Sequence, residues 1–228
     1  MKGHFGILVC LILLVSDEVS EAGSPCPSWK TVYPCFCSNL ADGGSLVICP
    51  GIKNTPELEQ VTKPLKSLIV DRLLLLNTFN SNQEDDSTLN SLEQKTKIPI
   101  GDILPKKWLA ELRVRELEIQ NGNIDGCFLC DEALEGQRDF LTTLVVKNAN
   151  LKGHLCSTCG LGSSVISVST KELKRTPLLK YVDFSHNSIE FVDGYAFPVN
   201  LTELTKVILS YNHISRIYDN AFSNLLKL

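Results

Sequence analysis

The chain has 228 residues, of which 43% are hydrophobic and 21% charged, and its formal net charge is -4. This balance excludes a disordered, a collagen-like or a polytopic membrane protein, and the absence of any basic block argues against a nucleic-acid partner. Leucine supplies 35 residues, about 15% of the chain, whereas aromatic residues make up 7%. That excess predicts a repetitive aliphatic core.

The first 22 residues predict a secretory signal peptide. Lys2 precedes an apolar run over residues 5–15, and Ser20 and Ala22 occupy the small-residue positions of a cleavage site after Ala22. The run is too short to cross a bilayer, so an uncleaved anchor is the weaker alternative. No second apolar segment of this kind follows. We therefore expect a secreted, extracellular product without membrane insertion.

Eight cysteines remain after cleavage, because Cys10 leaves with the signal peptide. An even number of cysteines in a secreted chain predicts disulfides. They form two groups of four, and the first group belongs to a predicted N-terminal cap over residues 23–60, with a hairpin turn at Gly43–Gly44. The groups are Cys26, Cys35, Cys37 and Cys49, and then Cys127, Cys130, Cys156 and Cys159.

The region after the cap begins with a predicted strand and a polar insertion. Val70, Leu73 and Leu75 have the spacing of a first repeat strand, and residues 80–97 are polar. We interpret residues 80–97 as a surface insertion or a short helix; a cation site at the acidic pair within it is the weaker alternative. The next apolar residues, Ile100, Ile103 and Trp108, have the spacing of a return arm.

The C-terminal third repeats with a period of 25 residues. The shift superposes Leu179 on Leu204, Val182 on Val207, Phe184 on Leu209, Asn187 on Asn212 and Ile189 on Ile214. This is the leucine-rich repeat pattern, in which a short strand buries alternate residues and an Asn satisfies backbone groups at the turn that follows.

Two weaker copies precede these repeats. They begin at Val114 and Leu141, and they carry Gly122 and Ala149 at the Asn position. Because Asn residues flank both substitutions, we expect a one-residue shift to restore the pattern. The predicted fold is an α/β solenoid over residues 61–228, with a parallel concave sheet and an irregular or 3-10 convex side.

The second cysteine group consists of two C-x-x-C motifs that follow equivalent strand ends. Adjacent strands lie about 4.8 Å apart, which is within the Cα separation that a disulfide needs. We therefore expect two bridges between neighbouring repeats. A zinc site and a redox-active C-x-x-C are the weaker alternatives, and we expect no metal and no cofactor.

The first cysteine group resembles the N-terminal cap of extracellular leucine-rich repeat proteins. That resemblance implies the pairs Cys26–Cys37 and Cys35–Cys49. Three segments, residues 34–37, 46–49 and 137–144, are also similar to arthropod proteins named as the non-catalytic subunit of shrimp-type luciferin monooxygenase. The resemblance implies a partner subunit that carries no catalysis.

No catalytic motif is present, so we expect a protein-binding module and not an enzyme. One alternative is an accessory subunit of an extracellular oxidative enzyme, which implies a hetero-oligomer. The others are a fragment of a Toll-like or adhesion receptor ectodomain, and a purely structural protein whose outward strand residues contact only solvent. Asn200 begins a glycosylation sequon on a return arm. Leu228 falls where a further repeat would begin, so we expect an incomplete C-terminal end as readily as a natural one. The candidate partner-binding residues are the outward strand positions Glu116, Glu118, Thr143, Val145, Lys147, Tyr181, Asp183, Lys206, Ile208 and Tyr211.

Overall fold

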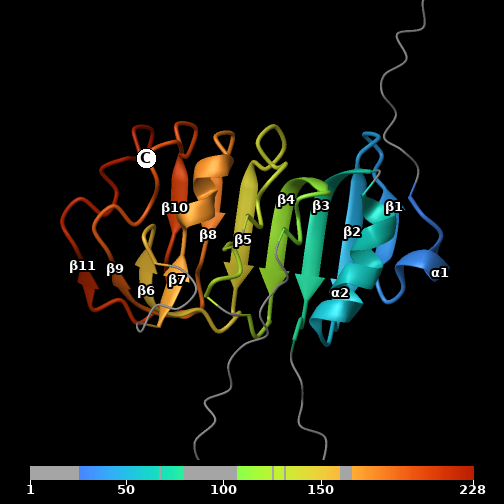
Figure 1. Ribbon diagram of the computed structural model, residues 1–228, viewed down its shortest axis with the longest axis horizontal. Helices are drawn as coiled ribbons and strands as arrows, with labels where there is room; N and C mark the ends of the chain where they lie inside the picture. Colours follow the sequence, from blue (N-terminus) through green and yellow to red (C-terminus); the bar gives the residue numbers. More distant parts are fainter. Residues whose placement is uncertain (1–25, 67, 80–106, 125, 131, 160–165) are drawn as a thin grey trace, which may run out of the picture.

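The computed structural model describes residues 26–66, 68–79, 107–124, 126–130, 132–159 and 166–228 (Figure 1). The predicted signal peptide, the polar insertion at 80–97 and the return-arm residues Ile100 and Ile103 lie outside these ranges. Within the described part of the chain, no helix is long and apolar enough to cross a membrane.

A seven-stranded sheet runs the length of the molecule (Figure 1). Its order is β1-β2-β3-β4-β5-β8-β10, and every neighbouring pair is parallel except β1 with β2. Parallel neighbours need a crossover through another layer, so each strand after β2 contributes one unit of a stack. The strands are β1 (Phe36–Asn39), β2 (Ser45–Pro50), β3 (Ile69–Leu76), β4 (Arg113–Gln120), β5 (Thr143–Lys147), β8 (Tyr181–Asp183) and β10 (Lys206–Ile208).

The strands predicted from the repeat frame lie side by side with equivalent residues paired. Leu73 pairs with Leu117, Leu117 with Leu144, Leu144 with Val182, and Val182 with Val207. The first four of these residues are completely buried. Because side chains alternate across a strand, this register directs one face of every strand into a common core and the other face outward.

An antiparallel hairpin and two disulfides close the N-terminal end. Gly43, at a φ of +83°, makes the turn between β1 and β2, a conformation that L side chains rarely adopt. The bridges join Cys26 to Cys37 and Cys35 to Cys49, which are the pairs that the resemblance implied. The short helix α1 (Trp29–Val32) buries Val32 beneath the hairpin.

Helix α2 (Thr55–Thr62) and the 3-10 turn η1 (Lys63–Leu65) connect β2 to β3. The Asn54 side chain accepts a hydrogen bond from the Glu57 backbone N–H at 3.0 Å, and the Glu57 carboxylate accepts one from Lys53 N–H at 2.7 Å. These contacts satisfy donors that a helix start leaves unpaired. The helix buries Leu58 and Val61 against the sheet.

A second, four-stranded parallel sheet packs against the same core in the C-terminal half. Its order is β11-β9-β6-β7, and Leu155, Val168 and Val192 from it are completely buried. The prediction of an irregular or 3-10 side is therefore wrong for this half, although the 3-10 turn η2 (Lys171–Arg175) lies on this side. The strands are β6 (Lys152–Cys156), β7 (Ser167–Ser169), β9 (Ser188–Val192) and β11 (Arg216–Ile217).

A left-handed residue follows each parallel strand of the large sheet after β2, directly after β3, β4 and β5 and three residues after the end of β8 and β10. Asn occupies this position in three units, where its short polar side chain tolerates a positive φ, and His186 and Tyr211 occupy it in the last two. The residues and φ values are Asn77 (52°), Asn121 (54°), Asn148 (48°), His186 (57°) and Tyr211 (55°).

The expected one-residue shift at Gly122 and Ala149 does not occur. Gly122 N–H donates to Asn148 O at 3.0 Å and Ala149 stays buried at the Asn position. Asn187 of the next unit accepts from the backbone N–H groups of Ala149 and Leu151 at 3.0 and 3.2 Å and donates to Val146 O at 2.8 Å, and Asn212 makes the equivalent contacts with its own preceding unit. The buried Asn187 side chain thus forms hydrogen bonds with the backbone of its own unit and of the preceding unit.

The prediction of disulfides between neighbouring repeats is also wrong. Cys127 pairs with Cys130 and Cys156 pairs with Cys159, with Cα separations of 5.0 and 5.8 Å. Equivalent positions along the sequence do not bring the two motifs together, because β7 lies between them: Gly126 O accepts from Ser169 N–H, and Cys156 O accepts from Thr170 N–H, both at 2.9 Å.

A buried glutamine holds the chain that enters β4. Gln137 has no exposed surface; its Nε2 donates to Leu109 O at 2.6 Å and to Leu112 O, and its Oε1 accepts from Val114 N–H at 3.1 Å. All three partners are backbone groups that would otherwise be buried without hydrogen bonds.

Replacing Gln137 with Met, a side chain of similar size, leaves these three backbone groups unpaired. We expect Q137M to lower the free energy of unfolding by about 3 kcal/mol, since each buried unsatisfied group costs roughly 1–3 kcal/mol and relaxation recovers part of that. Chemical denaturation followed by tryptophan fluorescence measures the change. Exposed Arg138 provides the control, and R138M should change stability by less than about 0.5 kcal/mol. Equal effects of the two substitutions would contradict the role given to Gln137.

Candidate interaction surface on the outer face of the large sheet

The outer face of the seven-stranded sheet carries the residues that alternate with the core positions. Polar and charged side chains occupy this face over β4, β5 and β8, and they contact one another across strands at the spacing of neighbouring parallel strands. We call this the outer face throughout.

Asp183 is the centre of the polar contacts on this face. Its side chain is 1% exposed, and it forms an ion pair with Lys147 Nζ at 2.9 Å. The Tyr181 hydroxyl donates to Asp183 Oδ2 at 3.0 Å, and the Ser185 backbone N–H donates to Oδ1 at 2.9 Å. The carboxylate is therefore covered by two side chains that it holds in place.

These contacts shift the pKa values of all three groups. Burial by itself would raise the pKa of Asp183, but hydrogen bonds from Ser185, Lys147 and Tyr181 outweigh burial and hold it below the ordinary value of 3.8. The hydrogen bond to Asp183 raises the pKa of Lys147 above 10.5. Burial, followed by the hydrogen bond to Asp183, raises the pKa of Tyr181. At neutral pH the cluster is a stable ion pair with a neutral tyrosine.

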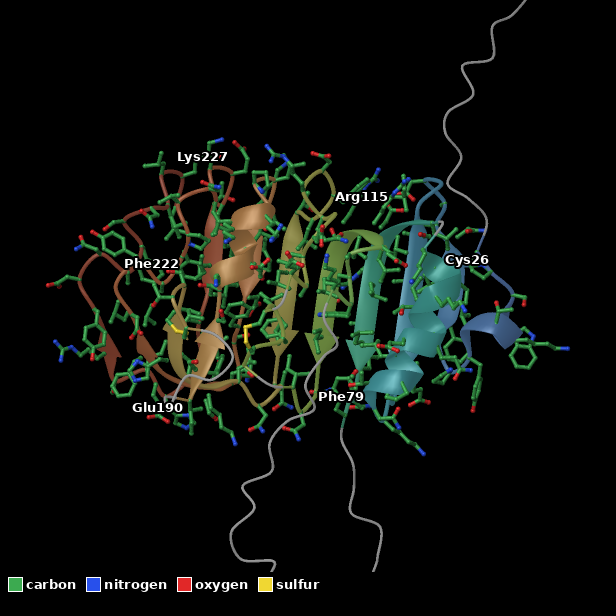
Figure 2. The ribbon with its side chains drawn as sticks, viewed as in Figure 1. Cys26, Phe79, Arg115, Glu190, Phe222 and Lys227 are labelled. Carbon is green, nitrogen blue, oxygen red and sulfur yellow. A yellow bond between two sulfur atoms is a disulfide. The ribbon has the colours of Figure 1, made fainter. Side chains whose placement is uncertain are left out.

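Two further ion pairs cross β3 and β4. Arg72 donates to Glu118 Oε2 from Nη2 at 2.6 Å and from Nε at 3.1 Å, and it lies 3.9 Å from Glu116. Arg115, labelled in Figure 2, donates to Asp71 at 2.6 Å. Exposed pairs of this kind contribute little to stability, but they fix which charges the face presents.

The structure separates the predicted partner-binding residues by accessibility. Glu116 and Lys206 are exposed, and Tyr211 is 75% exposed. Asp183 and Val145, at 1% and 6%, are buried and are not available to a partner, which corrects their predicted role. The half-buried residues are Glu118, Thr143, Lys147, Tyr181 and Ile208.

Sequence reasoning missed an apolar region at the N-terminal end of the outer face. Register places Phe36 beside Ile48 and Ile48 beside Leu74, and Phe36 is 61% exposed while the other two are half-buried. Extending the repeat frame backward from Leu73 and Leu75 would have assigned these outward positions. We call the region the apolar stripe; it consists of Phe36, Leu46, Ile48, Pro50, Leu74 and Leu76.

Aromatic residues mark the opposite end of the outer face. His186 and Tyr211, both at left-handed strand ends, stack with ring centroids 4.2 Å apart and an interplanar angle of 12°. Both are exposed. Lys206 Nζ lies 5.4 Å from the ring centroid of Tyr181, within the range of a cation–π contact.

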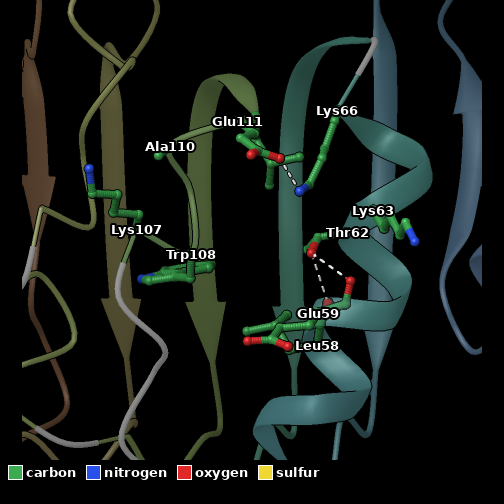
Figure 3. Close-up of a pocket in the computed structure, with 10 residues that line it drawn as sticks. Leu58, Glu59, Thr62, Lys63, Lys66, Lys107, Trp108, Ala110 and Glu111 are labelled. Carbon is green, nitrogen blue, oxygen red and sulfur yellow. Dashed lines mark hydrogen bonds and ion pairs between the residues drawn. The ribbon is translucent and has the colours of Figure 1, made fainter.

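A hollow of about 350 Å³ lies away from the outer face, between α2 and the segment over residues 107–112 (Figure 3). Trp108 and Leu58 line it, and the Lys66–Glu111 ion pair bridges it. Lys107 is paired with Glu132 and Glu135. The charges around the hollow are thus largely satisfied within the protein.

Among the described residues, no group of three or more His, Cys, Asp or Glu side chains is arranged to hold a metal ion. The two C-x-x-C motifs, which sequence spacing allowed as a zinc site, form disulfides and offer no thiolate ligands.

Comparison with known proteins gives distant relatives. No protein-family profile matches the chain. It is 29% identical to Amphoterin-induced protein 2 of Mus musculus over 96 residues, and 31% identical to the proteins of the same name from Pongo abelii and Rattus norvegicus. Each match covers 39% of this chain and 18% of the relative. These relatives are leucine-rich repeat proteins, so the likeness supports leucine-rich repeat homology over that part.

Removing the Asp183 carboxylate should destabilise the protein. Asp183→Ala leaves the Tyr181 hydroxyl and the Ser185 N–H without their acceptor, and we expect the free energy of unfolding to fall by about 2 kcal/mol. The loss of the ion pair adds little to this cost, because the half-exposed Lys147 ammonium group can be hydrated in the variant. Urea denaturation measures the change. Glu116→Ala on the same face removes an exposed carboxylate and should cost less than about 0.5 kcal/mol. A loss for E116A equal to that for D183A would contradict the prediction.

The contribution of the cluster should depend on pH. Because folding lowers the pKa of Asp183, its stabilisation is present above the unfolded value of about 3.9 and is lost as pH falls through the folded value. Because folding raises the pKa of Lys147, the stabilisation from its charge is fully present below the unfolded value of 10.5 and is lost as pH rises through the higher folded value. The stability difference between the wild type and Asp183→Asn should be constant from about pH 5 to 9 and shrink in acid. Urea denaturation across this range measures it, and a difference that grows below pH 4 would contradict the assignment.

Proposed function

We propose that this chain is a secreted leucine-rich repeat solenoid without catalytic activity, and that it binds another protein through the outer face, which is the concave side of the solenoid. The observation that carries the proposal is the apolar stripe beside a set of fixed charges. Six apolar side chains lie in contiguous register on β1, β2 and β3, and Arg72, Glu116 and Glu118 border them.

The solenoid is supported by the stacking of equivalent residues in parallel strands and by the homology to leucine-rich repeat proteins. In such a stack each unit buries one face and leaves the other free. The four disulfides support an oxidising, extracellular environment. Asn200 is exposed and remains the proposed glycosylation site.

A protein partner fits this surface better than a small molecule or a polyanion does. The face is a sheet surface, and the hollow near α2 lies elsewhere. Its residues mix apolar, aromatic and oppositely charged side chains, as protein interfaces do. Cross-strand ion pairs and disulfide-bonded strands also make it rigid, which lowers the entropy lost on binding.

Two further candidates follow from likenesses. The relatives are leucine-rich repeat proteins of which this chain spans 18%, and a Toll-like or adhesion receptor ectodomain is the second candidate. The third candidate, an accessory subunit in a hetero-oligomer, rests on the resemblance of residues 34–37, 46–49 and 137–144 to non-catalytic subunits of luciferin monooxygenase. Co-purification from native extracellular fluid distinguishes them, because only the accessory subunit brings oxidase activity with it.

Charge placed in the apolar stripe should strongly reduce partner capture. We expect Leu74→Glu to reduce recovery of a cross-linked partner from native extracellular fluid by at least tenfold, because burying an unpaired carboxylate costs several kcal/mol. Quantitative mass spectrometry of the captured proteins measures the loss, and circular dichroism checks that the variant is folded.

Val199 provides the matched control, because it is 65% exposed and lies next to Asn200 and away from the outer face. Val199→Glu should leave capture unchanged. Equal capture by wild type and L74E would place the binding surface elsewhere, whereas equal loss in L74E and V199E would indicate a charge effect without a defined site.

A further inference from the structure

The two C-x-x-C disulfides lie on either side of β7, on the side of the core away from the outer face (Figure 2). Hydrogen bonds connect the loops to this strand: Ser169 N–H donates to Gly126 O at 2.9 Å, and Ser169 Oγ donates to Cys159 O at 2.8 Å. Each bridge joins cysteines three residues apart, so neither connects one unit to the next.

Other contacts hold the neighbouring units together in this region. β6 pairs with both β7 and β9, Thr170 Oγ1 donates to Ala196 O, and Asn187 connects the turn after β5 to the turn after β8. The stabilisation from a disulfide grows with the length of the loop that it closes. The Cys35–Cys49 bridge spans 14 residues of sequence, whereas each C-x-x-C bridge spans three. Opening a C-x-x-C bridge therefore removes little that the fold requires.

The C-x-x-C cysteines are more accessible than those of the buried cap bridge Cys35–Cys49, whereas Cys26 and Cys37 of the other cap bridge are also half-buried. Cys35 and Cys49 are 2% and 0% exposed. Cys127 and Cys130 are half-buried, and in the other motif Cys159 is half-buried while Cys156 is 3% exposed. Thiol–disulfide exchange requires a thiolate to reach one sulfur of the bridge. Each motif has at least one half-buried cysteine through which this attack can occur.

We propose that the two C-x-x-C disulfides form a thiol–disulfide exchange site that reacts once per bridge, and therefore not catalytically, with a dithiol such as two neighbouring cysteines of a partner protein. A partner thiolate attacks Sγ of Cys159, the bond between the two chain sulfurs breaks, and Cys156 leaves as a thiolate that takes a proton from water. The second partner thiolate attacks the mixed disulfide and releases Cys159, which is protonated in turn. The partner gains a disulfide and the chain gains two thiols. The Cys127–Cys130 bridge undergoes the same exchange.

Dithiothreitol serves as the dithiol probe on the intact protein. Graded concentrations, followed by alkylation and peptide mass spectrometry, should open both C-x-x-C bridges while Cys35–Cys49 remains closed and circular dichroism is unchanged. One molecule of dithiothreitol should be oxidised for each bridge that opens. If the C-x-x-C bridges open only together with Cys35–Cys49, or only when the folded signal is lost, the proposal is wrong.

A matched pair of variants tests which sulfur is attacked. Cys156→Ser leaves the half-buried Cys159 as a free thiol, and Cys159→Ser leaves the buried Cys156. With glutathione disulfide as the probe, C156S should form the mixed disulfide several-fold faster than C159S, and both should keep the wild-type circular dichroism. Equal or reversed rates would overturn the role given to Cys159.

Discussion

Parallel strand pairing in a fixed register is the constraint on which the rest of this structure depends. A strand that buries one face leaves an apolar row that only an equivalent strand can extend, and here Leu73, Leu117, Leu144 and Val182 form that row. A slip of one residue would turn every core side chain outward. The left-handed residue after each strand keeps the register, because it turns every unit into the return layer at the same place.

The same register determines what the outer face presents. Asp183 is close to the half-buried Lys147 because β5 and β8 are neighbours, although 36 residues separate the two in sequence. The apolar stripe likewise forms because the hairpin of the cap continues the sheet that the repeats begin. Cap and repeats therefore present one surface, in which a rigid apolar region borders fixed charges. The opposite side holds the hollow near α2 and the C-x-x-C bridges, so the molecule presents two chemically different sides.

Sequence reasoning succeeded where local periodicity carries the information. The positions of Leu73, Leu117, Leu144, Val182 and Val207 followed from spacing, and the structure pairs them as equivalents. It failed where the answer depends on contacts between units. Asn187 forms hydrogen bonds with the backbone of the preceding unit at Ala149 and Leu151, and nothing in the Ala149 segment reveals this. Gln137 is a similar case, since its three partners lie 23 to 28 residues away.

The sequence by itself determined the strand positions of the large sheet from β3 onward, the repeat frame, the hairpin turn and the outward-facing residues of β4, β5, β8 and β10, because alternation and turn residues are local properties of a chain. Only the tertiary structure decided which outward residues are accessible, since the burial of Asp183 depends on Lys147 and Tyr181 closing over it. It also decided the disulfide pairing of the second cysteine group. Because β7 lies between the two motifs, each cysteine pairs with the other cysteine of its own motif.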